Sequence, residues 1–473
     1  MLPDDVLLEI FDFYVDKDAG EDLKSIESWI TLAHVCRCWR SIVFQSPRRL
    51  NLRLVCTTKT RMRDTLDIWP PFPLAIYHTC RNEPNDTPGV SGVNNIIAAL
   101  VRNDRVGQIH FTSLESEYYP SLAAMQKPFP ELTHLRLGIP WFHPHVIPDS
   151  FLGGTAPRLR SLELDGVPFP GLPKLLLSAT HLVYLDLLNI PRSGYSPPEA
   201  MATSLSALTN LESLHLEFQY TQSRDPPALV ESRRPPRLLL TRSILSCLTE
   251  IRFKGTSEYL EEILARIDAP RLNKMHIYFS NQIKFHTPQL LQLISQNPRL
   301  RTPEKGHVAF TYKAVIVKFP SRTSDYDALG VRIECSAKWQ LSSLEQVCTS
   351  FLPPLPTLED LYIFVDRTSP PHWQDDVERS AWLEHLHPFV AVKNLYLCKN
   401  IVPRIAPALQ ELVGARTTGV FPTLENIFLE GFQPSRPRHV GIEKFVAARQ
   451  LTSHPVAVSR WDRDGHWEIV DDT

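Results

Sequence analysis

In the sequence APRLRSLEL, residues 156–164, three leucines follow the pattern Leu-x-x-Leu-x-Leu. Its last three residues, Leu162, Glu163 and Leu164, alternate apolar and polar types, which is typical of a strand with one buried face. We therefore expect both leucines to point into a core and Glu163 to point away from it.

The same six-residue phrase occurs nine times, with conservative replacements of the leucines. The spacing is mostly in the twenties, with longer gaps at proline-rich insertions, and several copies follow a Pro-x-Leu lead-in. Repetition at this period indicates structural units stacked on one another. The copies span residues 132–137, 159–164, 182–187, 211–216, 248–253, 272–277, 358–363, 392–397 and 424–429.

This pattern resembles that of leucine-rich repeats, in which each unit is a short strand followed by a helical or irregular return. The resemblance implies an α/β fold: an irregular solenoid with parallel strands on its concave face. We expect degenerate first repeats at 49–56, 74–80 and 106–114, and irregular ones at 308–335. An ordinary α/β core is the alternative. Return helices are expected at 172–181, 198–208, 258–268, 288–296, 339–351 and 402–413.

The middle residue of each Leu-x-Leu should lie in a row along the concave face. In chain order this row is Arg136, Glu163, Asp186, His215, Arg252, His276, Tyr362, Tyr396 and Phe428. Exposed aromatic clusters are typical of protein-binding surfaces. We predict that Tyr362, Tyr396 and Phe428 contact a protein substrate. In the alternative, these rings pack beneath residues 460–470, which include Trp461 and Trp467.

The first fifty residues have a different pattern and predict two short amphipathic helices. Pro3, Asp4 and Asp5 form a helix start, and Pro47 ends the second helix. A unit of this size is too small for a core of its own, so part of its apolar surface should contact a partner. In the alternative, the helices only cap the rest of the chain. The two apolar series are Val6, Leu7, Ile10, Phe11 and Tyr14, then Trp29, Leu32, Cys36, Trp39 and Val43.

The stretches LPDDVLLEIFDFY (2–14) and LAHVCRCWRSIVF (32–44) together resemble an F-box. With the repeats, the chain resembles F-box proteins with C-terminal leucine-rich repeats of the fungal type. The resemblance implies a substrate-recognition subunit that binds a Skp-family adaptor and, through it, a cullin–RING ubiquitin ligase. A repeat scaffold outside any ligase is the alternative. The adaptor-binding residues implied are Leu2, Pro3, Leu7, Ile10, Phe11, Leu32, Val35, Cys36, Trp39 and Ile42.

Histidines and cysteines raise the question of a metal site, and we expect none, nor any cofactor. On one continuous helix Cys36 and Cys38 would lie about 200° apart, and His34 with Cys38 supplies two of the four ligands that structural zinc needs. The pairs His143/His145 and His385/His387 have no supporting ligands nearby; a metal-dependent enzyme using them is a further alternative. No catalytic motif is present, so no catalytic residue is expected.

Composition agrees with a globular chain of 473 residues, 43% hydrophobic and 22% charged, with a formal net charge of −2. This balance favours neither nucleic acid nor an anionic membrane as a partner. No secretory signal or membrane span is expected, and eight scattered cysteines suggest a reducing compartment, cytoplasmic and/or nuclear. The expected domains are an F-box (1–48), a solenoid (49–432) and a cap or tail (433–473), with a solvated proline-rich loop at 220–237.

Overall fold

The structure is a computed structural model that divides into two compact units, residues 1–219 and 220–473. Each unit is described by itself. The residues described are 2–15, 28–47, 49–60, 66, 69–79, 90–112, 114, 116–140, 145–219, 242–280, 286–320, 327–350, 357–373, 382, 386–412, 420–431, 440–451 and 454–462. The proline-rich loop at 220–237 and Trp467 therefore lie outside them.

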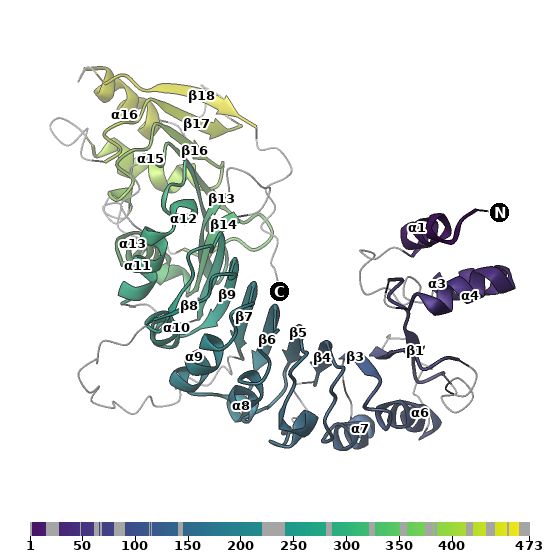
Figure 1. Cartoon of the computed structure of the whole chain (residues 1–473). Coiled ribbons are helices and arrows are strands. Elements are labelled where there is room, and N and C mark those ends of the chain that lie inside the picture. Colours follow the sequence, from purple (N-terminus) through teal and green to yellow (C-terminus); the bar gives the residue numbers. More distant parts are fainter. Residues whose placement is uncertain are drawn as a thin grey trace. The chain divides into compact units, whose positions relative to one another are not determined.

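The first unit begins with three helices that lie beside one another (Figure 1): α1 (Asp4–Tyr14), α3 (Ser28–Val35) and α4 (Arg37–Gln45). Trp29 of α3 is fully buried and meets the rings of Trp69 and Phe72 edge to face. Its indole N–H donates to the carbonyl of Arg53, at 3.0 Å. A buried indole needs such an acceptor, so Trp29 joins the helices to the first strand.

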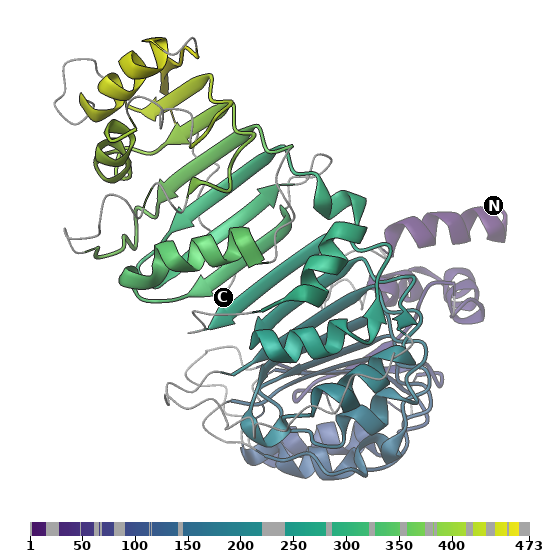
Figure 2. The same cartoon turned by 90° about the vertical axis from the view of Figure 1, so that its left-hand side faces the viewer.

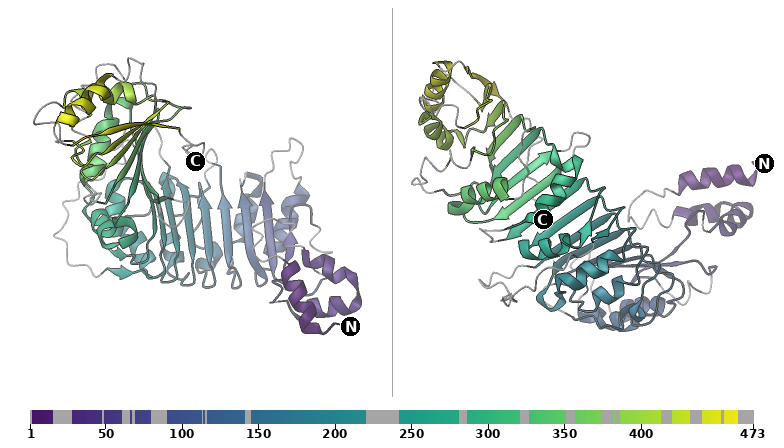
Figure 3. Two further views of the ribbon diagram at one scale, coloured as in Figure 1. Left: turned by 90° about the horizontal axis from the view of Figure 1, so that it is seen from above. Right: turned by 60° about the vertical axis from the view of Figure 1, so that its left-hand side comes forward.

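Seven parallel strands follow in the first unit and pair in chain order, β1 to β7. Figure 3 shows the blue strands of this unit side by side, and Figure 1 shows helices α6 to α9 along one side of them. The expected repeats at 49–56, 74–80 and 106–114 supply β1, β2 and β3. The elements are β1 (Leu54–Cys56), β2 (Leu74–Thr79), α6 (Val90–Leu100), β3 (Val106–Thr112), α7 (Tyr119–Ala124), β4 (His134–Gly138), β5 (Ser161–Asp165), α8 (Leu172–Leu176), β6 (Tyr184–Ile190), α9 (Pro198–Ser206) and β7 (Ser213–Phe218).

The second unit continues the same design with a mostly parallel sheet whose strand order is β9-β11-β14-β13-β12-β15-β16-β17-β18. Figure 2 shows its helices on one face of its strands. The elements are β8 (Ser243–Ile244), β9 (Glu250–Gly255), α10 (Ser257–Leu264), β10 (Ile267–Asp268), β11 (Lys274–Ser280), α11 (Pro288–Gln296), α12 (Pro298–Arg301), β12 (Lys305–Phe310), β13 (Ala314–Pro320), β14 (Asp327–Glu334), α13 (Gln340–Ser350), β15 (Asp360–Val365), β16 (Asn394–Leu397), α15 (Val402–Gln410), β17 (Asn426–Glu430), α16 (Val440–Leu451) and β18 (Ala457–Trp461).

The leucine phrase behaves as the sequence predicts in both units. All three apolar positions of all nine copies are buried, with at most 3% of each residue exposed. The expected return helices are present as α8, α9, α10, α11, α13 and α15, although residues 267–268 form strand β10 and not the end of a helix. The solenoid-like, mostly parallel α/β fold is therefore confirmed.

Residues 308–335 depart from the expected irregular repeats. They form a three-stranded insert in which β13 is antiparallel to both neighbours, and the order is reversed so that β14 pairs with β11 and β12 with β15. The physical reason is burial on both faces. Val308, Ala309 and Phe310 are consecutive buried residues, as are Ala314 to Val317, so the alternation that identifies a repeat strand is lost.

Residues expected to form a cap or tail extend the sheet. Strand β18 pairs in parallel with β17 over five residues. Helix α16 packs against α15 and carries the fully buried Arg449, whose guanidinium donates hydrogen bonds to the carbonyls of Val420 and Phe421. The parallel pairing of strands thus continues beyond residue 432.

The start of α11 predicts a measurable contribution to stability. The buried carboxylate of Glu261 on α10 accepts the backbone N–H groups of Gln289 and Leu290, both at 2.9 Å. Glu261→Ala leaves these first-turn donors without that acceptor, so we expect the free energy of unfolding to fall by about 1–3 kcal/mol. Urea denaturation measures this loss. Glu258→Ala, an exposed change on the same helix, is the control, and equal losses in both variants would contradict this role.

Burial of His307 in β12 predicts a pH dependence of stability. Burial lowers the pKa of its imidazole from 6.5 to about 4. Between these values the unfolded chain binds more protons than the folded one, so stability falls as pH drops from 6.5 towards 4, by up to about 3 kcal/mol. We expect His307→Gln to reduce this dependence in urea denaturation at pH 7 and pH 5. The exposed His387→Gln should leave it unchanged; a His307→Gln profile that matches the original chain would refute the assignment.

Candidate functional site

Helix α1 carries two apolar stripes and not the single stripe that the sequence predicts. Leu7 and Phe11 are buried, and the Phe11 ring contacts Trp39 with centroids 4.8 Å apart. Val6, Ile10 and Phe13 lie on the neighbouring face, because positions three and four apart share a helix face. They are 42%, 47% and 93% exposed. We call these three residues the exposed α1 stripe.

The three N-terminal helices concentrate exposed apolar side chains. Among the described residues, sixteen large hydrophobic side chains are exposed, and six of them lie between residues 2 and 35. Soluble surfaces rarely gather such side chains in one place unless they contact a partner. These six residues are Leu2, Val6, Ile10, Phe13, Tyr14 and Val35.

The ten predicted adaptor-binding residues differ in how deeply they are buried. Four of them are buried within the first unit and pack beneath the exposed residues. These four are Leu7, Phe11, Leu32 and Ile42. The half-buried Trp39 packs on Phe11. Sequence reasoning did not select Val6, Phe13 or Tyr14 as contacts, although the spacing of Val6, Ile10 and Phe13 could have identified a second stripe. The other predicted residues are exposed: Leu2, Pro3, Ile10, Val35 and Cys36.

One continuous helix over residues 29–43 was expected, and this was wrong. Cys36 has extended backbone, with φ −158° and ψ 171°, and separates α3 from α4. Its Sγ accepts the backbone N–H of Trp39 at 3.4 Å and so caps α4. Cys36 and Cys38 therefore do not lie on one helix, and the separation of about 200° expected for them is wrong. Within the described residues, no group of three or more His, Cys, Asp or Glu side chains is placed to hold a metal ion; His143 and His385 lie outside them.

The middle residues of the Leu-x-Leu strands form rows on one face of each sheet. This face lies opposite the helices, and we call it the open face. In the first unit Arg136, Glu163, Asp186 and His215 are paired from strand to strand. The row of the second unit begins with Arg252 and His276, continues through Gly330, Lys318 and His307, and reaches Tyr362. The predicted rows are thus present, with three insert residues that the sequence pattern did not identify.

Tyr362, Tyr396 and Phe428 stack face to face along this row, as the shared register of β15, β16 and β17 requires. Ring centroids are 4.1 Å and 4.4 Å apart, with 8° between planes in both pairs. All three side chains are half-buried. Burial and the neighbouring Tyr396 raise the pKa of Tyr362. We call Tyr362, Tyr396, Phe428 and Trp461 the aromatic ladder.

Trp461 of β18, the fourth member of the aromatic ladder, lies against the stacked rings of Tyr362 and Tyr396. Its ring meets Tyr362 and Tyr396 edge to face, with centroids 5.9 Å and 5.6 Å away. The alternative in which the rings pack beneath residues 460–470 is therefore present in part, because one residue of that segment contacts two of the rings. Residues 463–470 lie outside the described residues. Trp461 itself stays half-exposed and enlarges the aromatic surface.

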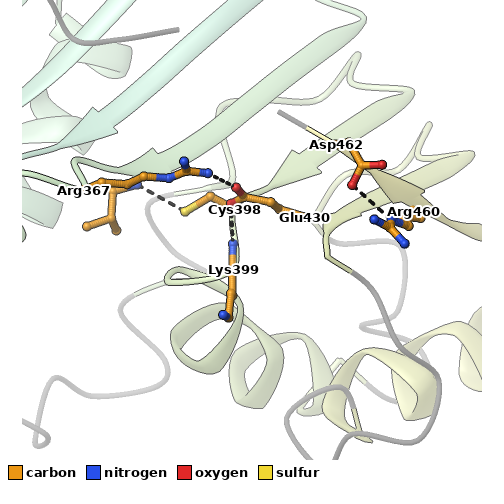
Figure 4. Close-up of polar contacts among 7 residues, drawn as sticks. Arg367, Cys398, Lys399, Glu430, Arg460 and Asp462 are labelled. Atoms are coloured by element: carbon orange, nitrogen blue, oxygen red, sulfur yellow. Dashed lines mark hydrogen bonds and ion pairs between the residues drawn. The ribbon is translucent and has the colours of Figure 1, made fainter. Parts of the chain in front are cut away.

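Polar groups border the aromatic ladder on both sides. On one side Asn426 donates to Asn394, at 2.8 Å, and Asn394 donates to Asp360, at 2.7 Å. On the other side, shown in Figure 4, Glu430 accepts the backbone N–H of Lys399 at 3.0 Å and forms an ion pair with Arg367. A half-exposed aromatic surface with a polar border is the arrangement typical of a protein-binding hot spot.

Among the comparisons with known proteins, a match to a protein family covers the N-terminal helices. Residues 1–53 match the family model of F-box-like domains. No curated protein sequence matches the chain. Among solved structures, the leucine-rich repeat-containing protein LegL7 from Legionella pneumophila aligns with 72% of this chain and 90% of its own, at 13% identity and a TM-score of 0.27. The repeat architecture is carried by the strand register and the buried leucines, and residues 1–53 are an F-box-like domain.

Proposed function

We propose that this chain is the substrate-recognition subunit of an SCF-type (Skp–cullin–F-box) ubiquitin ligase. The observation that carries the proposal is the exposed α1 stripe within a domain that matches the F-box-like family. Such domains are typically non-catalytic adaptors. The stripe would bind a Skp-family adaptor, and the leucine-rich-repeat sheet would bind a protein substrate.

In this role the chain contributes proximity and no bond-making chemistry. Holding a substrate and a ubiquitin-charged enzyme in one assembly raises their effective concentration. We accordingly assign no catalytic residue and no cofactor. No helix among the described residues is long and apolar enough to cross a membrane. We propose that the protein acts in the cytoplasm and/or nucleus. The assignment to the fungal type of F-box protein rests on the sequence resemblance.

The aromatic ladder is the surface we assign to the substrate. Its rings are held by strands whose other side chains are buried in the core, so their positions are fixed before a partner arrives. Rigid aromatic anchors lose little conformational entropy on binding and dominate many interfaces. Residues Tyr362, Tyr396 and Phe428 are therefore proposed to carry most of the binding free energy.

The adaptor-binding role predicts the effect of Ile10→Asp in the full chain. Because Ile10 is 47% exposed, the substitution should leave folding intact while it places a charge in the interface. We expect affinity for a purified Skp-family adaptor to fall at least about thirtyfold in calorimetric titration. Val101→Asp changes an exposed side chain of similar exposure, 55%, outside the F-box-like domain. Undetectable adaptor binding by the original chain, or an equal loss in Val101→Asp, would overturn the assignment.

The role of the aromatic ladder predicts a loss of substrate binding without a loss of adaptor binding. Replacing Tyr362, Tyr396 and Phe428 together by alanine should abolish co-purification of substrate proteins from cells in which the ligase is inactivated. Adaptor affinity should stay within about twofold of the original chain, because separate residues bind the adaptor. The matched control replaces three exposed tyrosines away from the ladder, Tyr184, Tyr195 and Tyr312. Unchanged substrate capture by the ladder variant would show that another surface holds the substrate.

A further inference from the structure

The open face of the second unit carries a concentration of positive charge next to the aromatic ladder. Its two middle rows over β9, β11, β14, β13 and β12 contain Arg252, Lys254, Lys318 and Arg332. No carboxylate occurs in these two rows, and all residues of these five strands are described. We call the four basic residues the cationic cluster.

The carboxylates near this cluster lie in the outer rows and offset only part of its charge. Glu250 contacts Arg252 at 2.7 Å, Asp327 contacts Lys318 at 3.0 Å, and Glu334 accepts the hydroxyl of Tyr278 at 3.0 Å. On the open face of these strands six lysines and arginines, including Lys274 and Lys305, stand against these three acids. The chain as a whole has a net charge of −2, so the positive sign of this face is local.

An aromatic ring contacts two members of the cationic cluster. Tyr278 lies between two of its members, with the Lys254 ammonium 5.2 Å and the Arg332 guanidinium 5.3 Å from the ring centroid. Cation–π contacts of this kind hold long basic side chains in one arrangement. Arg252 remains 47% exposed and Lys318 34% exposed over their side chains. The cluster therefore combines two basic side chains held by Tyr278 with two that are partly exposed to solvent.

The cationic cluster and the aromatic ladder belong to one register. Lys318 of β13 pairs with His307 of β12, which pairs with Tyr362 of β15. Four strand spacings separate Arg332 on β14 from Tyr396 on β16, which is about 19 Å. An extended peptide covers that distance with about six residues.

We propose that this face binds an extended protein segment whose acidic residues contact the cationic cluster and whose aromatic or large apolar residue contacts the aromatic ladder. The proposal rests on the proposed function, since it defines the substrate class that the repeats would accept. Charge complementarity selects the acidic part, and the half-buried aromatic rings select the apolar part.

Single-stranded nucleic acid is the other class of partner that combines negative charge with stacking groups. It requires free ring faces for its bases. Both faces of Tyr396 are covered, by Tyr362 and by Phe428. The central ring of the ladder thus offers no free face for a base to stack on, which favours a protein segment.

The test uses the full chain and a fluorescent acidic peptide. This peptide has a run of glutamates, a spacer of about six alternating glycines and serines that matches the separation of Arg332 from Tyr396, and a terminal Trp-Leu. We expect saturable binding in fluorescence anisotropy that weakens as salt rises. A basic peptide, with lysine in place of every glutamate, should bind at least about tenfold more weakly.

Variants of the chain locate the binding surface. Arg252→Gln combined with Lys254→Gln should weaken binding of the acidic peptide about tenfold, because two positioned charges are lost. The control pair Arg299→Gln and Lys444→Gln, exposed on helices of the same unit, should leave it unchanged. Circular dichroism of both double variants checks that a loss of binding is not a loss of folding.

Three outcomes would overturn the proposal. These are no saturable binding of the acidic peptide, equal binding of the basic peptide, and tighter binding of a short single-stranded polyuridine. Adaptor titration is measured on the same preparation. Failed adaptor binding with retained peptide binding would refute the ligase role alone, and the reverse would refute this inference alone.

Discussion

Burial of alternate side chains from each parallel strand determines how the repeats stack and which side chains stay outside the core. Leu162 and Leu164 are almost completely buried, and so are the corresponding pairs in the other eight copies. Each strand hydrogen-bonds to its neighbour in register, so burial in one repeat sets the orientation of the next. A single repeat cannot bury its apolar face alone, and the stack stabilises every member of it.

This constraint leaves the open face without a role in the leucine core, so its chemistry can change from strand to strand. In the first unit the row includes Glu163 and Asp186, with Arg136 beside Glu163 at 3.0 Å. In the second unit it changes from basic to aromatic residues along a single register. Such variation on a constant core is the usual way in which repeat proteins differ in partner.

The F-box-like helices keep part of their apolar surface exposed, because a unit this small cannot bury all of it. The deeply buried Trp29 joins them to the first strand through the carbonyl of Arg53. Phe11 and Trp39 pack between the helices. The exposed α1 stripe is the apolar surface that remains, which is why it is the strongest candidate for a partner site.

The sequence by itself determined the repeat strands, their buried leucines, most return helices and the outward row, because alternation and period are local properties of the chain. The F-box-like segment was equally readable from its motif. Tertiary structure alone decided the reversed order of β12 to β14, the extended backbone at Cys36 and the second stripe of α1. It also decided the contact of Trp461 with Tyr362 and Tyr396. These features depend on which distant segments pair and cover one another, and no local pattern of residues encodes that choice.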